Sequence, residues 1–254
     1  MRLNTVYMIL LSIGVIGFVA WRIRAVETMH SPQYEIVEDP SGSHGPACQS
    51  LPGLVEHVLE SPDATPGSTL TVLVLGDQST ANEPRRLGLY PIPTITRVAE
   101  GRNEIARRRG ELLADIQNKC RSVRETTISP IYLGVKQAVV DLRAKGCHAG
   151  SRCRLYVDSD LEENVETSIM RSLHSRSGRA TSLPPPIDNA GINIAFCGTA
   201  VVVNHIIGPS GRRVATVVPR SAGQEDRIRR VWRRLFAQPE AVTFEPYCPE
   251  SNAL

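Results

Sequence analysis

Three short stretches of the 254-residue sequence place oxygen-bearing side chains beside apolar runs. Asp77 and Ser79 follow the run LTVLVLG, Thr126, Thr127 and Ser129 precede a Pro-initiated apolar stretch, and Asp158, Ser159 and Asp160 follow RLYV. Carboxylates and hydroxyls without histidine suit magnesium or calcium better than zinc. The pattern therefore predicts a hard-cation site made by side chains from these three loops.

These residue types also have a purely structural explanation. Asp and Ser after a buried strand often cap the next helix or close a turn without any ion. We keep this alternative open, because DQST alone at 77–80 carries little information. Three loops that supply oxygen in the same chain favour the cation site.

The elements that must position these residues alternate along the chain. Short apolar runs predict strands at 70–76, 154–157, 192–196, 200–203 and 242–247. Helical spacing of apolar residues predicts helices over 100–119, 130–144 and 225–236, with Ser129 as the cap before Pro130. The fold class expected is α/β, a doubly wound and mainly parallel sheet with helices on both faces. In such sheets ligands bind beyond the carboxyl ends of the strands.

The chain divides into three parts by composition. Residues 1–24 are expected to be an N-terminal membrane anchor, because Thr5 to Trp21 carries no charge and Arg22 follows at once. A cleaved signal peptide is the alternative, although the run does not end in a small-x-small site. Residues 25–68 are rich in Pro, Ser and Gly and are expected to form a tether, with one or two helical turns at the apolar stretch LVEHVL. Residues 69–254 hold the predicted α/β domain.

Cysteine usage indicates the compartment. All six cysteines follow the apolar run, and no C-x-x-C pair occurs. An even number on one side of an anchor predicts up to three disulfides and an exported domain, periplasmic or extracellular, at the cell envelope. We expect Cys147 and Cys153 to form a local disulfide, with buried free thiols as the alternative.

Net charge excludes little. The chain has 29 basic and 26 acidic residues, for a formal charge of +3. This balance gives no reason to expect nucleic acid as a partner. The arginines at 107–109 and 227–234 lie opposite apolar stripes and are expected on solvated helix faces.

The order of motifs resembles that of the von Willebrand factor A-type domain family. DQSTA at 77–81, TTISPIY at 126–132 and LYVDSDLEEN at 155–164 are similar to the family's D-x-S-x-S, Thr-containing and S-D motifs. The closing helix and strand are similar too, so the resemblance covers residues 70–248. It implies a metal-ion-dependent adhesion site in which Asp77, Ser79, Ser129 (or Thr127) and Asp160 hold Mg²⁺ or another divalent cation. Ala81 departs from the pattern, because it has no oxygen where the family has serine.

The resemblance implies a binding or assembly protein rather than an enzyme. An acidic group of a protein partner would complete the coordination of the ion, and the N-terminal helix would hold the protein to the membrane. One alternative is a structural domain of the same fold with a non-functional metal site. Another is a haloacid-dehalogenase-like phosphatase with Asp158 as nucleophile and Asp160 as general acid, although Glu162 does not fit that motif.

Overall fold

The computed structural model describes residues 31–41, 48–76, 84–94, 101–126, 129–162, 183–199, 201–207 and 213–249. The predicted membrane anchor lies outside these ranges, and so do Asp77, Ser79, Ala81 and Thr127. Within the described ranges no helix combines the length and apolarity needed to cross a membrane.

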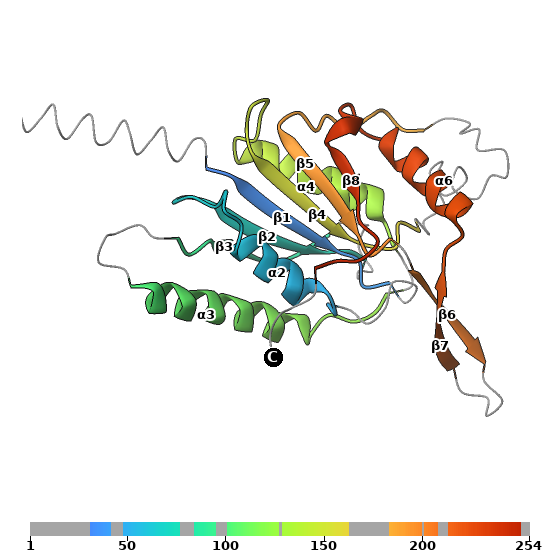
Figure 1. Cartoon of the computed structure of the whole chain (residues 1–254), viewed down its shortest axis with the longest axis horizontal. Coiled ribbons are helices and arrows are strands. Elements are labelled where there is room, and N and C mark those ends of the chain that lie inside the picture. The colour runs from blue at the N-terminus through green and yellow to red at the C-terminus, as the bar shows by residue number, and fades with distance from the viewer. Residues whose placement is uncertain are drawn as a thin grey trace, which may run out of the picture.

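A six-stranded sheet forms the centre of the molecule, with the strand order β3-β2-β1-β4-β5-β8. Every neighbouring pair is parallel except β2 and β3, which are antiparallel. Figure 1 shows the strands side by side, with the carboxyl ends of β2, β1, β4, β5 and β8 at one edge of the sheet. The strands are β1 (Gln33–Glu38), β2 (Thr69–Val74), β3 (Arg85–Pro91), β4 (Cys153–Asp158), β5 (Ile192–Cys197) and β8 (Val242–Phe244).

The central strand, β1, was not expected. It lies in the range 25–68 that composition predicts to be a tether, yet all six of its residues are buried. It pairs with β2 on one side and β4 on the other. The helix α2 (Leu51–Leu59) falls in the same range and is also buried along one side. The tether prediction is therefore wrong for the described part of 25–68, which belongs to the α/β domain.

Helices cover both faces of the sheet. Helix α2 and α3 (Arg102–Cys120) pack with Tyr34 and Ile36 of β1 in one apolar cluster. On the other face α4 (Ile131–Ala144) and α6 (Ala222–Arg233) pack with Val37 of β1 in a second cluster. Figure 1 shows the two layers on opposite sides of the strands. The predicted α/β class, with a mainly parallel sheet between helices, is confirmed.

A separate hairpin interrupts the connection from β5 to α6. Its strands β6 (Val201–Ile207) and β7 (Arg213–Pro219) are antiparallel and form a two-stranded sheet of their own. In Figure 1 this hairpin extends away from the carboxyl edge of the main sheet. After α6, the short 3-10 helix η1 (Pro239–Ala241) leads into β8.

All six cysteines are paired. The disulfides are Cys48–Cys120, Cys147–Cys153 and Cys197–Cys248. The first joins the start of α2 to the end of α3, and the third joins the end of β5 to the chain after β8. The local Cys147–Cys153 disulfide is the one predicted from spacing, and the prediction of up to three disulfides is confirmed.

Candidate metal centre

The candidate site lies where the strand order reverses direction. From β1 the chain winds outward to β2 on one side, and later places β4 on the other side. A crevice at this switch point is where open α/β sheets bind ligands. Asp39 directly follows β1, and its backbone N–H donates to the carbonyl of Asp158, 3.0 Å away at the end of β4. The loops after the two central strands therefore start side by side.

Five buried oxygen-bearing residues from three loops converge here, and we call them the rim cluster. At most 1% of the surface of any of them is exposed. One oxygen of the Asp39 carboxylate, Oδ2, accepts hydrogen bonds from Ser129 Oγ at 2.6 Å and from Ser159 Oγ at 2.8 Å. Its other oxygen, Oδ1, accepts the backbone N–H of Ser41 at 3.2 Å. The members are Asp39, Ser41, Ser129, Ser159 and Asp160.

Ser129 belongs to this cluster rather than to a helix cap. Pro130 is the N-cap residue of α4, and no side chain caps that helix. The hydroxyl of Ser129 donates to Asp39 instead. The cap predicted from the sequence is therefore wrong. The Ser129 hydroxyl lies among the oxygens of the rim cluster, and its role as a metal ligand stays a prediction. The preceding Thr126 also reaches the site, since its backbone pairs with Ser41 in an isolated bridge.

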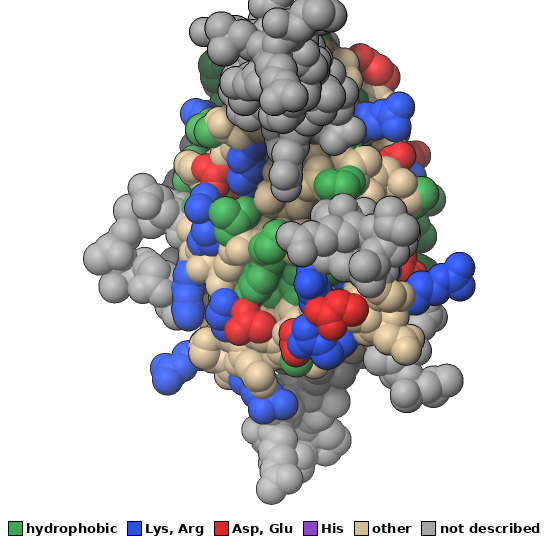
Figure 2. Space-filling model, turned by 90° about the vertical axis from the view of Figure 1, so that its left-hand side faces the viewer, with side chains coloured by type: hydrophobic (Ala, Val, Ile, Leu, Met, Phe, Trp, Pro, Cys, Tyr) green, Lys and Arg blue, Asp and Glu red, His purple; other side chains and the backbone are tan. Residues whose placement is uncertain are grey.

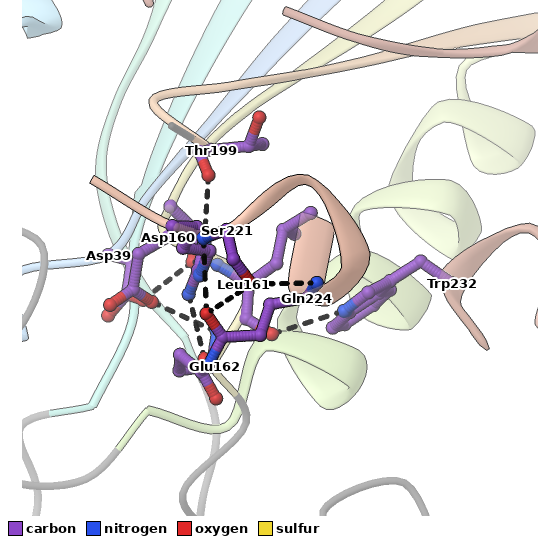
Figure 3. A network of polar contacts seen from close by, with 10 residues as sticks. Asp39, Asp160, Leu161, Glu162, Thr199, Ser221, Gln224 and Trp232 are labelled. Atoms are coloured by element: carbon purple, nitrogen blue, oxygen red, sulfur yellow. Dashed lines mark hydrogen bonds and ion pairs between the residues drawn. The ribbon is translucent and has the colours of Figure 1, made fainter. Parts of the chain in front are cut away.

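Asp160 is held in a tight loop after β4 (Figure 3). Its Oδ1 accepts the backbone N–H of Glu162 at 2.9 Å, and Ser159 Oγ accepts that of Leu161 at 3.0 Å. Leu161 has a φ of 63°, which a side-chain-bearing residue rarely adopts. The indole Nε1–H of Trp232 donates to the Leu161 carbonyl at 3.2 Å. A buried residue of α6 thus fixes the backbone that presents Asp160.

The start of α6 fixes the same loop from another direction. The Arg220 guanidinium donates to the Thr199 carbonyl at 2.8 Å and to Glu162 at 2.9 Å. Only 3% of the Arg220 side chain is exposed. The next residue, Ser221, forms a capping box with Gln224, so the first turn of α6 is itself well defined (Figure 3).

A complete D-x-S-x-S sequence follows β1 and was missed by the sequence analysis. It is DPSGS at 39–43, and it has serine where the 77–81 stretch has Ala81. The signal was available, because the spacing of Asp39, Ser41 and Ser43 is that of the family motif. It was overlooked because QYEIVE does not look like a buried strand and the following Pro, Ser and Gly suggest a linker. Ser43 lies outside the described residues.

The structure brings together two of the four predicted ligands. Ser129 and Asp160 both lie in the rim cluster, around an aspartate that was not predicted. Asp77 and Ser79 lie outside the described residues, so their role stays a prediction. The central carboxylate among the described residues is Asp39.

A second pair of carboxyl groups, those of Glu38 and Asp158, lies on the α2 side of the sheet. Ser50 Oγ donates to Asp158 Oδ2, and the Cys48 N–H donates to Glu38 Oε1 at 2.6 Å. Burial, and then the neighbouring charge of Asp158, raises the pKa of Glu38 well above its usual range. We therefore interpret Glu38 as protonated and hydrogen-bonded to Asp158.

The contacts of Asp158 bear on two other kinds of site: a metal bound with Cys197 and Cys248, and the active site of a phosphatase. The Sγ of Cys248 lies 3.0 Å from Asp158 Oδ1, but Cys248 and Cys197 are bonded to each other and offer no thiolate to a metal. Asp158 and Asp160 have different hydrogen-bond partners, at Ser50 and at Glu162. The phosphatase alternative, which needs these two acids on one substrate, stays a prediction.

The residues of the rim cluster fit a hard divalent cation. They supply two carboxylates and three hydroxyls, and oxygen is the donor that Mg²⁺ and Mn²⁺ prefer. Both carboxylates are buried, and buried charges are normally paired or coordinated to metal. Asp39 and Asp160 would supply the charge, and the hydroxyls of Ser41 and Ser129 would complete the protein's share of the ligands.

Comparisons with known proteins give a distant likeness to solved structures. No family model and no curated protein matches the chain. Among solved structures, the chain is similar to the crystal structure of the manganese-loaded Plasmodium vivax TRAP protein, at 12% identity. The match covers 76% of this chain and 78% of that one, with a TM-score of 0.30. A likeness this distant says nothing about what this chain binds. The α/β fold is compatible with that of the A-type domains.

Proposed function

We propose that this protein is an A-type-like binding or assembly component that engages a protein partner through a divalent cation. The observation that carries the proposal is the convergence of the rim cluster at the switch point of the sheet, with Asp39 Oδ2 accepting from both Ser129 and Ser159. A buried carboxylate oriented by two hydroxyls is preorganised to bind a cation without rearrangement.

Each residue of the cluster has a distinct part in this function. Asp39 and Asp160 provide the negative charge, while Ser159 orients Asp39 and fixes the Leu161 backbone. When bound, the ion offers a coordination position to an acidic group of the partner. Trp232, through the Leu161 carbonyl, would keep the Asp160 loop in place as the partner binds. Specificity would come from the surrounding loops.

Titration calorimetry of the full chain in mild detergent with Mn²⁺, and then with Mg²⁺, tests the cation site. The wild type is expected to bind one ion, and Asp160→Asn is expected to bind at least tenfold more weakly, since even second-sphere changes cost about 10–100-fold. Asp226→Asn is the matched control, because Asp226 is an exposed aspartate on α6. No binding to the wild type would leave a structural domain with a non-functional site.

Acetate is a probe for the carboxylate of the partner. If a coordination position stays open, acetate should displace water from the protein-bound Mn²⁺ and lower the enhancement of water-proton relaxation. Asp226→Asn should behave like the wild type. An unchanged relaxation rate at saturating acetate would contradict a role in binding acidic partners, even if the ion itself binds.

We further propose that the protein is anchored to a membrane by residues 1–24, with its α/β domain exported. Three disulfides support an oxidising compartment. Alkylation of intact cells with a membrane-impermeant maleimide, after reduction, should label these cysteines without lysis. Labelling only after lysis would place the domain inside the cell.

A further inference from the structure

The β6–β7 hairpin is set apart from the rest of the molecule. Among the described elements, β6 and β7 make extensive contacts only with each other. No other described strand pairs with either one, so each has an edge without a hydrogen-bonding neighbour in this part of the chain. A two-stranded hairpin alone is at best marginally stable in water. Pairing with a further strand would supply the contacts that a lone hairpin lacks.

The composition of the hairpin is that of an interior strand pair. Eight of its fourteen strand residues are Val or Ile. Directly opposed residues lie on one face, and the register places Val203 opposite Val217 on one face and Val202 opposite Val218 on the other. Both faces therefore carry β-branched residues, whereas a solvated hairpin would have one polar face.

The two edges of the hairpin differ. Strand β7 begins with Arg213 and ends with Pro219. Charged residues and proline are devices that natural sheets use to prevent pairing at an edge. Strand β6, VVVNHII, has no proline, lysine, arginine or acidic residue. The edge of β6 is therefore the one suited to pairing with another strand. Insertion of the hairpin into lipid is excluded, because unpaired strand edges are not tolerated there.

The sequence of β6 is complementary to itself. In a symmetric antiparallel pair, opposed residues share a face, so one residue must lie opposite its own copy on the two-fold axis. With Asn204 on the axis, Val201 lies opposite Ile207 and Val202 lies opposite Ile206. Cross-strand pairs of β-branched residues of this kind stabilise a sheet. The two Asn204 amides can donate to and accept from each other.

Neighbouring registers fit less well. Moving the axis to Val203 places Asn204 opposite Val202, and moving it to His205 places Asn204 opposite Ile206. Either change puts an amide opposite an apolar side chain on both sides of the axis. With Asn204 on the axis, the mixed pair Val203 with His205 also occurs on both sides, but all seven residues of β6 are paired, whereas an axis at Val203 or His205 pairs only five. One register is therefore preferred over the adjacent ones.

We propose that two copies of this chain associate through their β6 edges, antiparallel and centred on Asn204, to form a four-stranded sheet β7-β6-β6-β7. This inference does not depend on the proposed cation site. The contact is isologous, so it closes at a dimer, and Arg213 and Pro219 at the outer β7 edges oppose further growth.

Cysteine cross-linking in the full chain tests the register. Directly opposed residues lie about 4.5–5.5 Å apart between Cα atoms, within the range of a disulfide. Asn204→Cys is therefore expected to form a disulfide with its own copy under mild oxidation. Because the six native cysteines are already paired, the introduced thiol is the reactive one. Non-reducing electrophoresis gives the readout.

Matched variants make the test specific to the register. Val201→Cys alone should stay monomeric on the gel, because its copy lies about 20 Å away along the strand. A mixture of Val201→Cys and Ile207→Cys chains should cross-link to each other. Equal cross-linking of Asn204→Cys and Val201→Cys, or none in the mixture and in Asn204→Cys, would overturn the proposal.

Sedimentation velocity in mild detergent supplies a second measurement. The wild type is expected to be a dimer, and Val202→Lys is expected to shift it to monomer by placing a charge in the pairing edge. Val214→Lys, on the β7 strand, is the control and should leave the dimer intact. A monomeric wild type, or a dimer that Val202→Lys leaves unchanged, would contradict the proposed contact.

Discussion

Buried acids are the unusual residues of this chain. The central strand carries Glu35 and Glu38 at 0% and 1% exposure, and Asp39 follows them. Glu35 accepts from Lys145 Nζ at 3.4 Å, while the same ammonium donates to Thr71 at 2.5 Å. Burial outweighs the attraction of Lys145 and raises the pKa of Glu35 to about 8. At neutral pH we therefore interpret Glu35 as largely protonated.

The raised pKa of Glu35 predicts a loss of stability as pH rises. The folded state holds a proton that the unfolded state releases above its ordinary pKa of 4.5. The free energy of unfolding should thus fall between pH 4.5 and about 8, by at most about 1.4 kcal/mol per pH unit from this one group. Glu35→Gln, which is neutral at every pH, should remove that part of the slope. Urea unfolding at pH 5, 6, 7 and 8 measures it.

Glu240→Gln is the control for this experiment. Glu240 is an exposed glutamate within η1. Its replacement should leave the slope of the wild type unchanged. If Glu35→Gln has the same slope as the wild type, or a steeper one, Glu35 is not protonated in the folded protein.

At the scale of elements, a single glycine sets the start of β5. Gly191 has a φ of 76°, and a Cβ added there would lie 1.7 Å from the carbonyl oxygen of His148. That oxygen belongs to the backbone of the loop closed by the Cys147–Cys153 disulfide and cannot move freely. The approach of this loop to β5 therefore requires glycine at position 191.

Gly191→Ala is expected to lower the free energy of unfolding by about 3 kcal/mol, from left-handed strain and overpacking together. Gly223→Ala is the matched control in α6, where an added Cβ meets nothing within 4 Å. It should raise stability by about 0.5–1 kcal/mol, because alanine favours helix. Urea unfolding of both variants gives the comparison. A Gly191→Ala protein as stable as Gly223→Ala would contradict the close approach.

The elements that could be predicted are those whose apolar residues follow helical spacing or form an unbroken run. Predicted helices over 100–119 and 130–144 correspond to α3 and α4, and the runs LTVLVLG and INIAF correspond to β2 and β5. Strand β1 was not predictable from its pattern, because Gln33, Glu35 and Glu38 are polar and their burial depends on tertiary partners. Propensity yields to tertiary context at such positions. Because β1 was not predicted, Asp39, which directly follows it, was not recognised as a strand-end residue.

At the scale of the molecule, disulfides join segments that are distant in sequence. Cys48–Cys120 spans 72 residues and connects the two helices on one face. Cys147–Cys153 spans only 6. Closing a long loop removes more entropy from the unfolded chain than closing a short one. The long-range disulfide should therefore contribute more to stability.

Replacing both cysteines of each pair with alanine tests this difference. Loss of Cys48–Cys120 should lower the free energy of unfolding by about 4 kcal/mol, and loss of Cys147–Cys153 by about 2 kcal/mol, on the loop-entropy scale. Urea unfolding under non-reducing conditions measures both. The reverse order would show that contacts around Cys147, rather than loop closure, dominate.

The sequence predicted the fold class of the whole molecule, but it did not predict which loop carries the central carboxylate of the site. Alternating strands and helices indicated the α/β class, and the motif order indicated where loops would meet. Two sites in the chain read D-x-S, and the prediction from sequence used DQSTA at 77–81, while DPSGS at 39–43 fell within the predicted tether. Only the neighbour relations of β1 with β2 and β4 place Asp39 beside Ser129 and Ser159.

The central claim is that Asp39 is the principal carboxylate of a divalent-cation site. The most direct test is calorimetric titration of the full chain with Mn²⁺, comparing Asp39→Asn with the wild type and with the exposed control Asp226→Asn. We predict that Asp39→Asn weakens binding by more than about 100-fold, beyond the effect of a second-sphere residue. Asp226→Asn should bind within a few-fold of the wild type. Binding by Asp39→Asn as tight as by the wild type would contradict the account.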